Sequence, residues 1–145
     1  MILVSKNQQT DEYILRLERG EELVETLLSF CTAHQIRNAV LQGIGAGNHV
    51  EIGWYDFEQK IFIRKIYDED LELLSLIGNI APREGVPQFH AHVSLGRKDY
   101  SVIGGHLFSL HIWGAGEIVL RNIHQPFERR FDSATGLSLL CPSNF

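Results

Sequence analysis

A chain of 145 residues, 44% hydrophobic and 21% charged, is long enough to bury one core and has the composition of an ordinary globular protein. Its formal net charge of −5 argues against an extended basic surface that neutralises DNA phosphates. No apolar run approaches the roughly 18 residues of a membrane span, and residues 1–5 are too short for a signal peptide. Two cysteines are too few for a disulfide scaffold, so we expect a cytoplasmic protein.

The first part of the chain predicts one strand and one helix. Residues 12–18 largely alternate polar and apolar side chains, as in a strand with one wet face. Glu21 and Glu22 then place acid in the first turn of a helix, where the macrodipole favours it. This helix should run to about His34 and be the only long one. Its apolar stripe consists of Leu23, Leu27, Phe30 and Cys31.

The rest of the chain predicts strands. Glycines 43, 45 and 47 are interpreted as a turn and bulge rather than a dinucleotide-binding loop, because no helix follows them. Residues 114–116 predict another turn, and residues 82–87 a loop. The expected strands cover residues 38–45, 49–56, 61–67, 71–80, 89–96, 101–107, 117–120, 127–131 and 137–141.

We expect an α+β fold, in which one main α-helix packs on a largely antiparallel β-sheet. No internal repeat, linker or low-complexity segment divides the chain. The prediction is therefore a single domain over residues 1–145, with its core from about residue 10 to residue 142.

Three histidines are the candidate functional residues. His90 and His92 lie two apart in an apolar, β-prone run, so in a strand they point to the same face. His106 lies in the next predicted strand, directly after two glycines. Three imidazoles on neighbouring strands are a common route to a transition-metal site with an open position. The alternative is that these are separate, half-buried histidines. His111, an odd number of positions from His106, should point to the other face.

The register of the two strands decides whether His106 joins the pair. In an antiparallel pair, the numbers of directly opposed residues add to a constant. An even sum, from a turn of three or five residues or from a bulge at the glycine pair, puts His106 on the face of His90 and His92. An odd sum, from a two-residue turn at Lys98 and Asp99, puts it on the other face. The residues alone leave both registers open.

Four segments, in order, resemble the plants-and-prokaryotes-conserved (PPC) domain, in the form found in prokaryotic stand-alone proteins. They are residues 15–23, residues 43–46, residues 74–80, and the pair 90–96 with 102–107. The tail is also similar, at residues 127–132 and 135–137. The resemblance covers nearly the whole chain, and it implies an α+β fold that assembles as a homotrimer.

The resemblance also implies a metal and a partner. Stand-alone members bind zinc through the HxH and GGH histidines, which match His90, His92 and His106 here, and this favours the even register. In plants the domain follows AT-hook motifs, which carry the DNA contacts, while the domain itself mediates assembly and partner binding. This chain contains no Arg-Gly-Arg-Pro hook.

Three hypotheses for function follow. The first is a trimeric, DNA-associated or regulatory binding protein that carries a zinc ion on three histidines. The alternative is a zinc-dependent enzyme acting on a small molecule through a metal-bound water. Glu51, Asp56 and Glu117 are its acid or base candidates by residue type alone. The third is an inert oligomerisation module.

We expect any contact with DNA to be weak or to depend on a partner protein. Arg129 and Arg130 form the strongest basic cluster, with Arg121 as a further candidate, and the pair is interpreted as a solvated strand edge. The net charge of −5 opposes binding to a polyanion.

Overall fold

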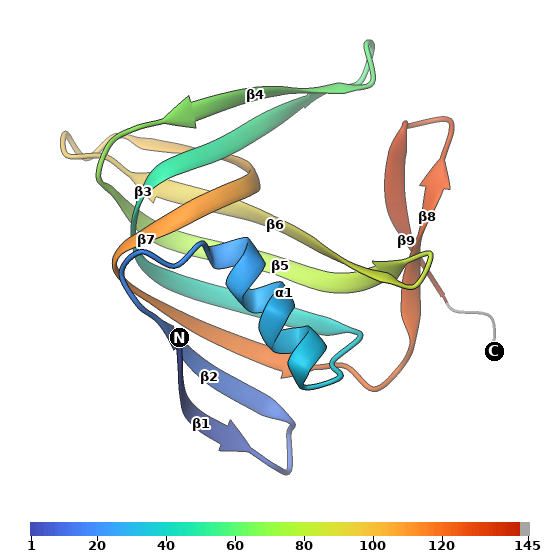
Figure 1. The fold of residues 1–145 in the computed structure, drawn as a ribbon. Coiled ribbons are helices and arrows are strands. Elements are labelled where there is room, and N and C mark those ends of the chain that lie inside the picture. The colour runs from blue at the N-terminus through green and yellow to red at the C-terminus, as the bar shows by residue number, and fades with distance from the viewer. Residues whose placement is uncertain (143–145) are drawn as a thin grey trace.

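The computed structural model describes residues 1–142, which form nine strands and one helix (Figure 1). The elements are β1 (Ile2–Asn7), β2 (Glu12–Leu17), α1 (Leu23–Ala33), β3 (Ala39–Asp56), β4 (Ile61–Tyr67), β5 (Leu71–Arg83), β6 (Val86–Gly96), β7 (Val102–Asn122), β8 (Phe127–Asp132) and β9 (Leu137–Pro142). The predicted loop at 82–87 shrinks to a tight turn, because β5 and β6 pair as far as Arg83 and Val86.

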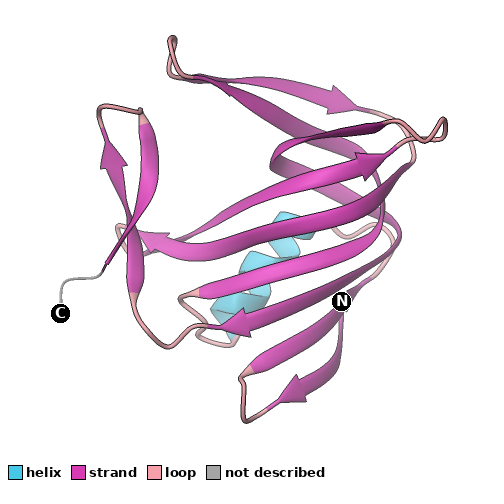
Figure 2. Cartoon of the chain, turned by 180° about the vertical axis from the view of Figure 1, so that it is seen from behind, coloured by secondary structure: helices cyan, strands magenta, loops and turns pink. Residues whose placement is uncertain are grey.

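Seven strands form one antiparallel sheet in the order β1-β2-β7-β6-β5-β3-β4, and β7 also pairs with β3. The strands β3, β5, β6 and β7 are therefore joined in a closed circuit, with every pair antiparallel. Figure 2 shows the curved sheet from behind, with the helix on its far side. β8 and β9 pair only with each other and stand at one end of the sheet. The strand β1, which the sequence did not predict, is an exposed edge strand beside β2.

The strands β3 and β7 are single long strands of 18 and 21 residues, where the sequence predicted interruption by glycine turns. The glycines at 43–47 cause shifts of register instead of a reversal, and β7 continues through residues 114–116. The two long strands pair with each other along most of their length, and on its other side β3 pairs with β5 and then β4, while β7 pairs with β6 and then β2. The turns predicted at glycines 43–47 and at residues 114–116 were wrong, whereas the bulge predicted at glycines 43–47 is present. Bulged strands absorb the extra residues by bending.

The helix α1 begins directly after Glu22, whose side chain accepts a hydrogen bond from the backbone N–H of Glu25 at 2.6 Å. It ends at Ala33, with His34 as its C-terminal cap, as predicted. Its four predicted apolar residues are all buried, and they join the core against the inner side of the sheet. The core is completed by side chains of β2, β3, β5, β6 and β7, among them Leu15, Leu41, Leu76, Leu95 and Ile118.

The predicted antiparallel sheet and single helix are confirmed. The helix has only 11 residues, so the architecture is more strongly β than the α+β prediction implied. Within residues 1–142, no helix is both long and apolar enough to span a membrane.

Candidate metal centre

A five-residue turn, residues 97–101, sets the register between β6 and β7. His92 lies directly opposite His106, so opposed residue numbers have an even sum, as the metal hypothesis required. The turn is closed by the N–H of Arg97, which donates to the carbonyl of Ser101 at 2.9 Å, and by Asp99, whose carboxylate accepts from the N–H of Ser101 at 2.9 Å. The pairing carries no bulge at the two glycines.

The glycines before His106 serve close packing. A Cβ on Gly104 would lie 2.4 Å from the carbonyl oxygen of Val93 on β6, and one on Gly105 would lie 2.8 Å from that of Gly53 on β3. Both distances are shorter than real side chains tolerate. The glycine pair therefore lets β7 lie between β6 and β3, which brings His106 beside the histidines of β6.

The three predicted histidines lie together. One ring nitrogen from each of His90, His92 and His106 falls within 4.8 Å of the other two, and no other such group of histidine, cysteine or acidic ligands occurs within residues 1–142. The Nε2 atoms of His90 and His92 are 3.4 Å apart. Two nitrogen ligands of one tetrahedral zinc, each at about 2.0–2.1 Å, lie about 3.3–3.4 Å apart. The donor set therefore fits a transition metal with an open position.

Two of the three imidazoles are held neutral. Burial lowers the pKa of His90 to about 4, and the charge of Arg129 acts in the same direction. Burial also lowers the pKa of His106 to about 4, followed by the effects of His90 and His92. A neutral imidazole has the free lone pair that a metal needs. Metal binding at neutral pH therefore does not require either ring to lose a proton.

Aromatic side chains hold His106 in place. Its ring lies 4.7 Å from the ring of Phe62 on β4 and 4.7 Å from that of Phe108 on β7, measured between centroids. Phe62 and Phe108 pack edge-on at 5.1 Å. The packing restricts the rotation of the imidazole, while His92 remains exposed to solvent.

Arg129 of β8 lines the site beside His90, where the sequence did not predict it. It was interpreted as part of a solvated strand edge, yet its side chain is only 7% exposed. One terminal nitrogen donates to Oδ1 of Asn79 at 2.5 Å and lies 3.2 Å from Nδ1 of His90, while the other donates to the carbonyl of Ser138 at 3.0 Å. The adjacent Arg130 is exposed and pairs with Glu128. Two neighbouring arginines look alike in the sequence, so only the packing of the β8–β9 hairpin shows which of them is buried.

A cavity of about 750 Å³ opens beside the histidines. Its wall is mostly aromatic and aliphatic, with a few polar side chains near Arg129. It is lined by Gly53, Trp54, Tyr55, Phe57, Phe62, Asn79, Gln88, Phe89, His90, His92, Gly105, His106, Arg129 and residues 137–140. A small molecule in this space would contact the three imidazoles directly.

The acid and base candidates named from residue type lie elsewhere. Glu51 pairs with Arg64 at 3.5 Å. Asp56 accepts two backbone hydrogen bonds within the β3–β4 turn, from Glu58 and Gln59, both at 2.9 Å. Glu117 lines a different hollow on the sheet. Within the described residues, no aspartate or glutamate lines the histidine cavity.

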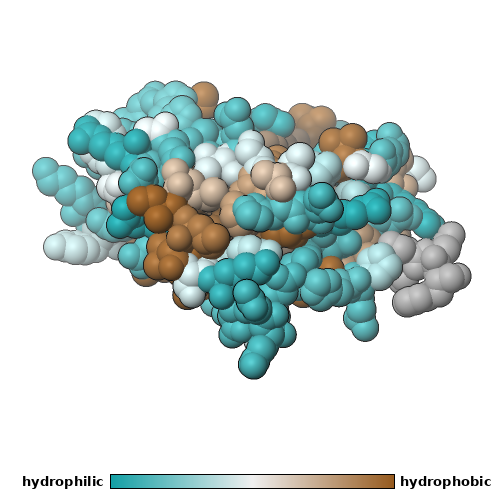
Figure 3. All heavy atoms as spheres, turned by 60° about the horizontal axis from the view of Figure 1, so that its bottom comes forward, coloured by the Kyte–Doolittle hydropathy of each residue, from teal (hydrophilic) through white to brown (hydrophobic). Residues whose placement is uncertain are grey.

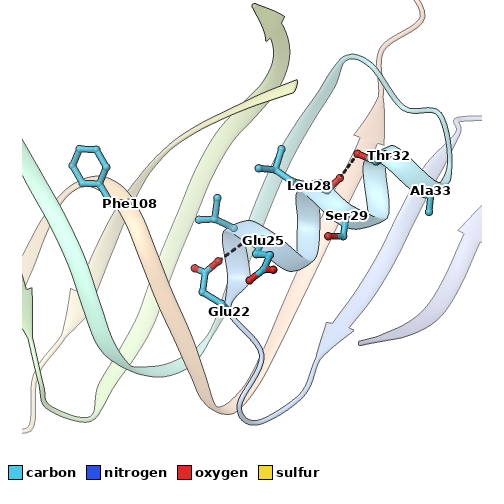
Figure 4. Close-up of a pocket in the computed structure, with 8 residues that line it drawn as sticks. Glu22, Glu25, Leu28, Ser29, Thr32, Ala33 and Phe108 are labelled. Atoms are coloured by element: carbon cyan, nitrogen blue, oxygen red, sulfur yellow. Dashed lines mark hydrogen bonds between the residues drawn. The ribbon is translucent and has the colours of Figure 1, made fainter. Parts of the chain in front are cut away.

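A second hollow of about 620 Å³ runs along α1 (Figure 4). It is a shallow groove between the helix and Phe108. Its most prominent acid, Glu22, is already used in the fold, because its two oxygens accept from the N–H groups of Glu25 and Leu110. His111 also lies away from the metal ligands, with its ring stacked on that of His49 at 5.5 Å.

The fold and the three-histidine group define a small antiparallel β-sheet protein with a candidate metal site. Comparison with known proteins identifies its family. The chain matches the Plants and Prokaryotes Conserved (PCC) domain over residues 4–124, and it belongs to this family, which is also abbreviated PPC. No curated protein sequence matches.

Solved structures support this assignment. A PPC protein of Pyrococcus horikoshii is 34% identical, with a TM-score of 0.85 over 92% of this chain and 93% of that one. A protein of Archaeoglobus fulgidus, described as metal-containing, is 38% identical, with a TM-score of 0.83 over 90% and 92%. A protein of Bacteroides thetaiotaomicron, described as a "putative DNA binding protein", is 29% identical, with a TM-score of 0.89 over 94% and 96%.

Proposed function

We propose that this chain is a metal-binding protein that holds one zinc ion on His90, His92 and His106, and that presents it to a small molecule in the adjoining cavity. The single observation that carries the proposal is the convergence of three ring nitrogens within 4.8 Å of one another on the wall of that cavity. The metal-containing relative from Archaeoglobus fulgidus supports it. Imidazole ligands suit zinc, although copper, iron and nickel also accept them.

The residues at this site have different roles. The three imidazoles supply the ligands, and the rings of Phe62 and Phe108 fix the direction of His106. When bound, zinc supplies Lewis acidity toward whatever occupies its remaining position. The aromatic wall of the cavity lies beside that position.

A second candidate function is a zinc-dependent enzyme for a small molecule. The observation that favours it is the cavity of about 750 Å³, which is larger than a purely structural metal requires. Because the lining within residues 1–142 includes no carboxylate, proton transfer would fall to the substrate or to solvent. A binding or regulatory role needs no such group and is the function we propose first.

We further propose that the chain is one domain that assembles as a homotrimer. The single domain is supported by Arg129, which links the β8–β9 hairpin to β5 and β6 through Asn79 and His90.

The homotrimer is proposed from the resemblance to the family. Three exposed isoleucines, Ile14, Ile44 and Ile77, surround a hollow on the sheet and supply an apolar surface for it. Figure 3, with the lower side of Figure 1 facing the viewer, shows apolar side chains gathered in patches among hydrophilic ones.

A role at DNA is proposed only through a partner protein. Two structural relatives carry the description "putative DNA-binding protein", but Arg129 of this chain is buried and Arg130 is paired with Glu128. Arg121 is exposed, and it lies directly opposite Glu12 in the sheet. The predicted basic cluster therefore offers little free positive charge to phosphates.

Elemental analysis of the purified protein tests the metal proposal. We expect close to one zinc per chain in the wild type, and loss of the metal in His90→Ala and in His106→Ala. His111→Ala is the matched control, because this histidine lies on the same strand as His106 but outside the group, and it should keep the metal. Full occupancy in both ligand variants would refute the site.

A further inference from the structure

The cavity beside the histidines contains a buried positive charge with no acidic counterpart. The guanidinium of Arg129 lines the cavity, its residue is 7% exposed, and it forms no ion pair with a carboxylate of residues 1–142. Its Nε atom is buried and has no hydrogen-bond partner among those residues. A charge taken out of water is normally paired, because an unpaired one loses the solvation that water provided. The neutral oxygens of Asn79 and Ser138 accept hydrogen bonds from Arg129, but no carboxylate of residues 1–142 balances its charge.

The metal site proposed above, on which this inference rests, sharpens the imbalance. A divalent cation held by the three histidines would add two positive charges to a cavity whose described lining has no aspartate or glutamate. Arg129 lies within 3.2 Å of the ring of His90, so the two cationic groups would repel each other across a single imidazole. An anion between them would neutralise both.

The hydrogen bonds of His90 lead to the same conclusion. A neutral imidazole carries one N–H, and the other nitrogen accepts. When His90 offers Nε2, the nitrogen that faces His92, as a ligand, its proton lies on Nδ1 and points toward the N–H of Arg129 at 3.2 Å. Two donors then face each other without an acceptor. An oxygen of an anionic ligand would accept from both groups.

We propose that this cavity binds an organic carboxylate, with its carboxylate group between Arg129 and the open side of the three-histidine site. The rest of the cavity indicates the body of the ligand. Trp54, Tyr55 and Phe89 contribute aromatic surface, and residues 137–140 contribute mainly leucines. This lining suits an apolar or aromatic carboxylic acid better than a small inorganic anion, which would leave the apolar wall exposed to water.

Cobalt replaces zinc in the test, because the visible absorption of Co²⁺ reports on its ligands. Wild-type protein loaded with Co²⁺ is titrated with benzoate, with benzyl alcohol as the uncharged analogue, and with inorganic phosphate. We expect benzoate to change the cobalt spectrum and to bind at least about tenfold more tightly than benzyl alcohol, the ratio expected from a hydrogen bond to a charged group. Phosphate should bind more weakly than benzoate.

Variants of Arg129 and Arg130 test whether Arg129 is responsible for the binding of benzoate. Arg129→Gln should weaken benzoate binding by about 10- to 100-fold, because the charge and its N–H donors are lost. The same variant should keep its Co²⁺ affinity or increase it, because a neighbouring cation is removed. Arg130→Gln, on the adjacent and exposed position of β8, should change benzoate binding by less than about twofold. Arg129→Lys keeps the charge and should retain part of the affinity.

The possible outcomes separate the two proposals. If Co²⁺ does not bind the wild type, both the metal site and this inference fail. If Co²⁺ binds but benzoate and benzyl alcohol behave alike, the metal site stands and the carboxylate site fails. The carboxylate class is also overturned if phosphate alone changes the spectrum. If Arg129→Gln loses Co²⁺ together with benzoate, Arg129 acts only as a structural support. Should that variant fail to fold, the wild-type comparison of benzoate with benzyl alcohol still decides.

Discussion

His92 on β6 lies directly opposite His106 on β7, across a hairpin closed by residues 97–101. This pairing places both rings on one face of the sheet, where His90, two residues from His92, joins them. A register different by one residue would have turned His106 to the opposite face and divided the group. The length of the turn and the close packing of Gly104 and Gly105 therefore determine that His106 lies beside the other two histidines.

Removing the aromatic support of His106 should weaken metal binding. We expect Phe62→Ala to reduce zinc affinity by about 10- to 100-fold, the usual effect of losing a group that orients a ligand. The ring of Phe62 packs on His106 at 4.7 Å, and without it the imidazole can rotate away. Competition with a chromophoric chelator measures the affinity. Phe57→Ala is the control, because Phe57 packs on Tyr55 and not on a histidine. Equal losses in both variants would contradict this role.

A side chain at Gly104 should destabilise the fold. In Gly104→Ala the new Cβ would lie 2.4 Å from the carbonyl oxygen of Val93, so β6 and β7 must separate. We expect a loss of about 1–3 kcal/mol in the free energy of unfolding. Gly114→Ala is the matched control in the same strand, since its Cβ would meet only Ala46 at 3.4 Å. Denaturant titrations at one fixed protein concentration compare the variants, and an unchanged Gly104→Ala would show that the strands have room to spare.

The contribution of Asp11 to the stability of the fold should depend on pH. Hydrogen bonding from Asn122 holds the pKa of the Asp11 carboxyl below its ordinary value of 3.8, with a further contribution from Tyr13. A lowered pKa stabilises the fold above the ordinary value, and this stabilisation disappears as pH falls through the folded-state pKa. The melting temperature of wild type should therefore exceed that of Asp11→Asn at pH 7, and the difference should shrink at pH values below 3.8. A difference that stays constant with pH would contradict the assignment.

The homotrimer should depend on the isoleucine surface. Light scattering should give about three times the chain mass of 16.5 kDa for wild type, and a smaller species for Ile77→Asp, because Ile77 is 67% exposed beside Ile14 and Ile44. Ile63→Asp is the matched control, with a 52% exposed isoleucine on β4. A monomeric wild type would overturn the trimer itself. Dissociation by the control alone would place the interface elsewhere.

Binding to duplex DNA should be weak. The chain has 13 lysines and arginines against 18 acids, and three copies triple its net charge of −5. We expect dissociation constants no tighter than about 10⁻⁴ to 10⁻⁶ M at physiological salt, the range of non-specific complexes. An anisotropy titration with mixed-sequence duplex at about 0.15 M salt measures this. Nanomolar binding that Arg130→Glu abolishes would show that a local patch outweighs the net charge.

The sequence by itself determined the antiparallel strands, the single helix with its buried stripe, and the shared face of His90 and His92. These features depend on local periodicity, which repeats every two residues in a strand and every 3.6 in a helix. The family pattern added His106. Periodicity did not distinguish a glycine turn from a glycine bulge, so β3 and β7 were each predicted in two pieces.

Only the tertiary structure decided the register of the histidine hairpin and the position of Arg129. An even or odd register depends on how residues 97–101 close the turn, and the same residue types are compatible with either. Arg129 and Arg130 are identical in type and adjacent in sequence, yet one is buried against His90 and the other is exposed beside Glu128. Adjacent residues in a strand point to opposite faces, so the packing of the β8–β9 hairpin against β5 determined which arginine entered the cavity.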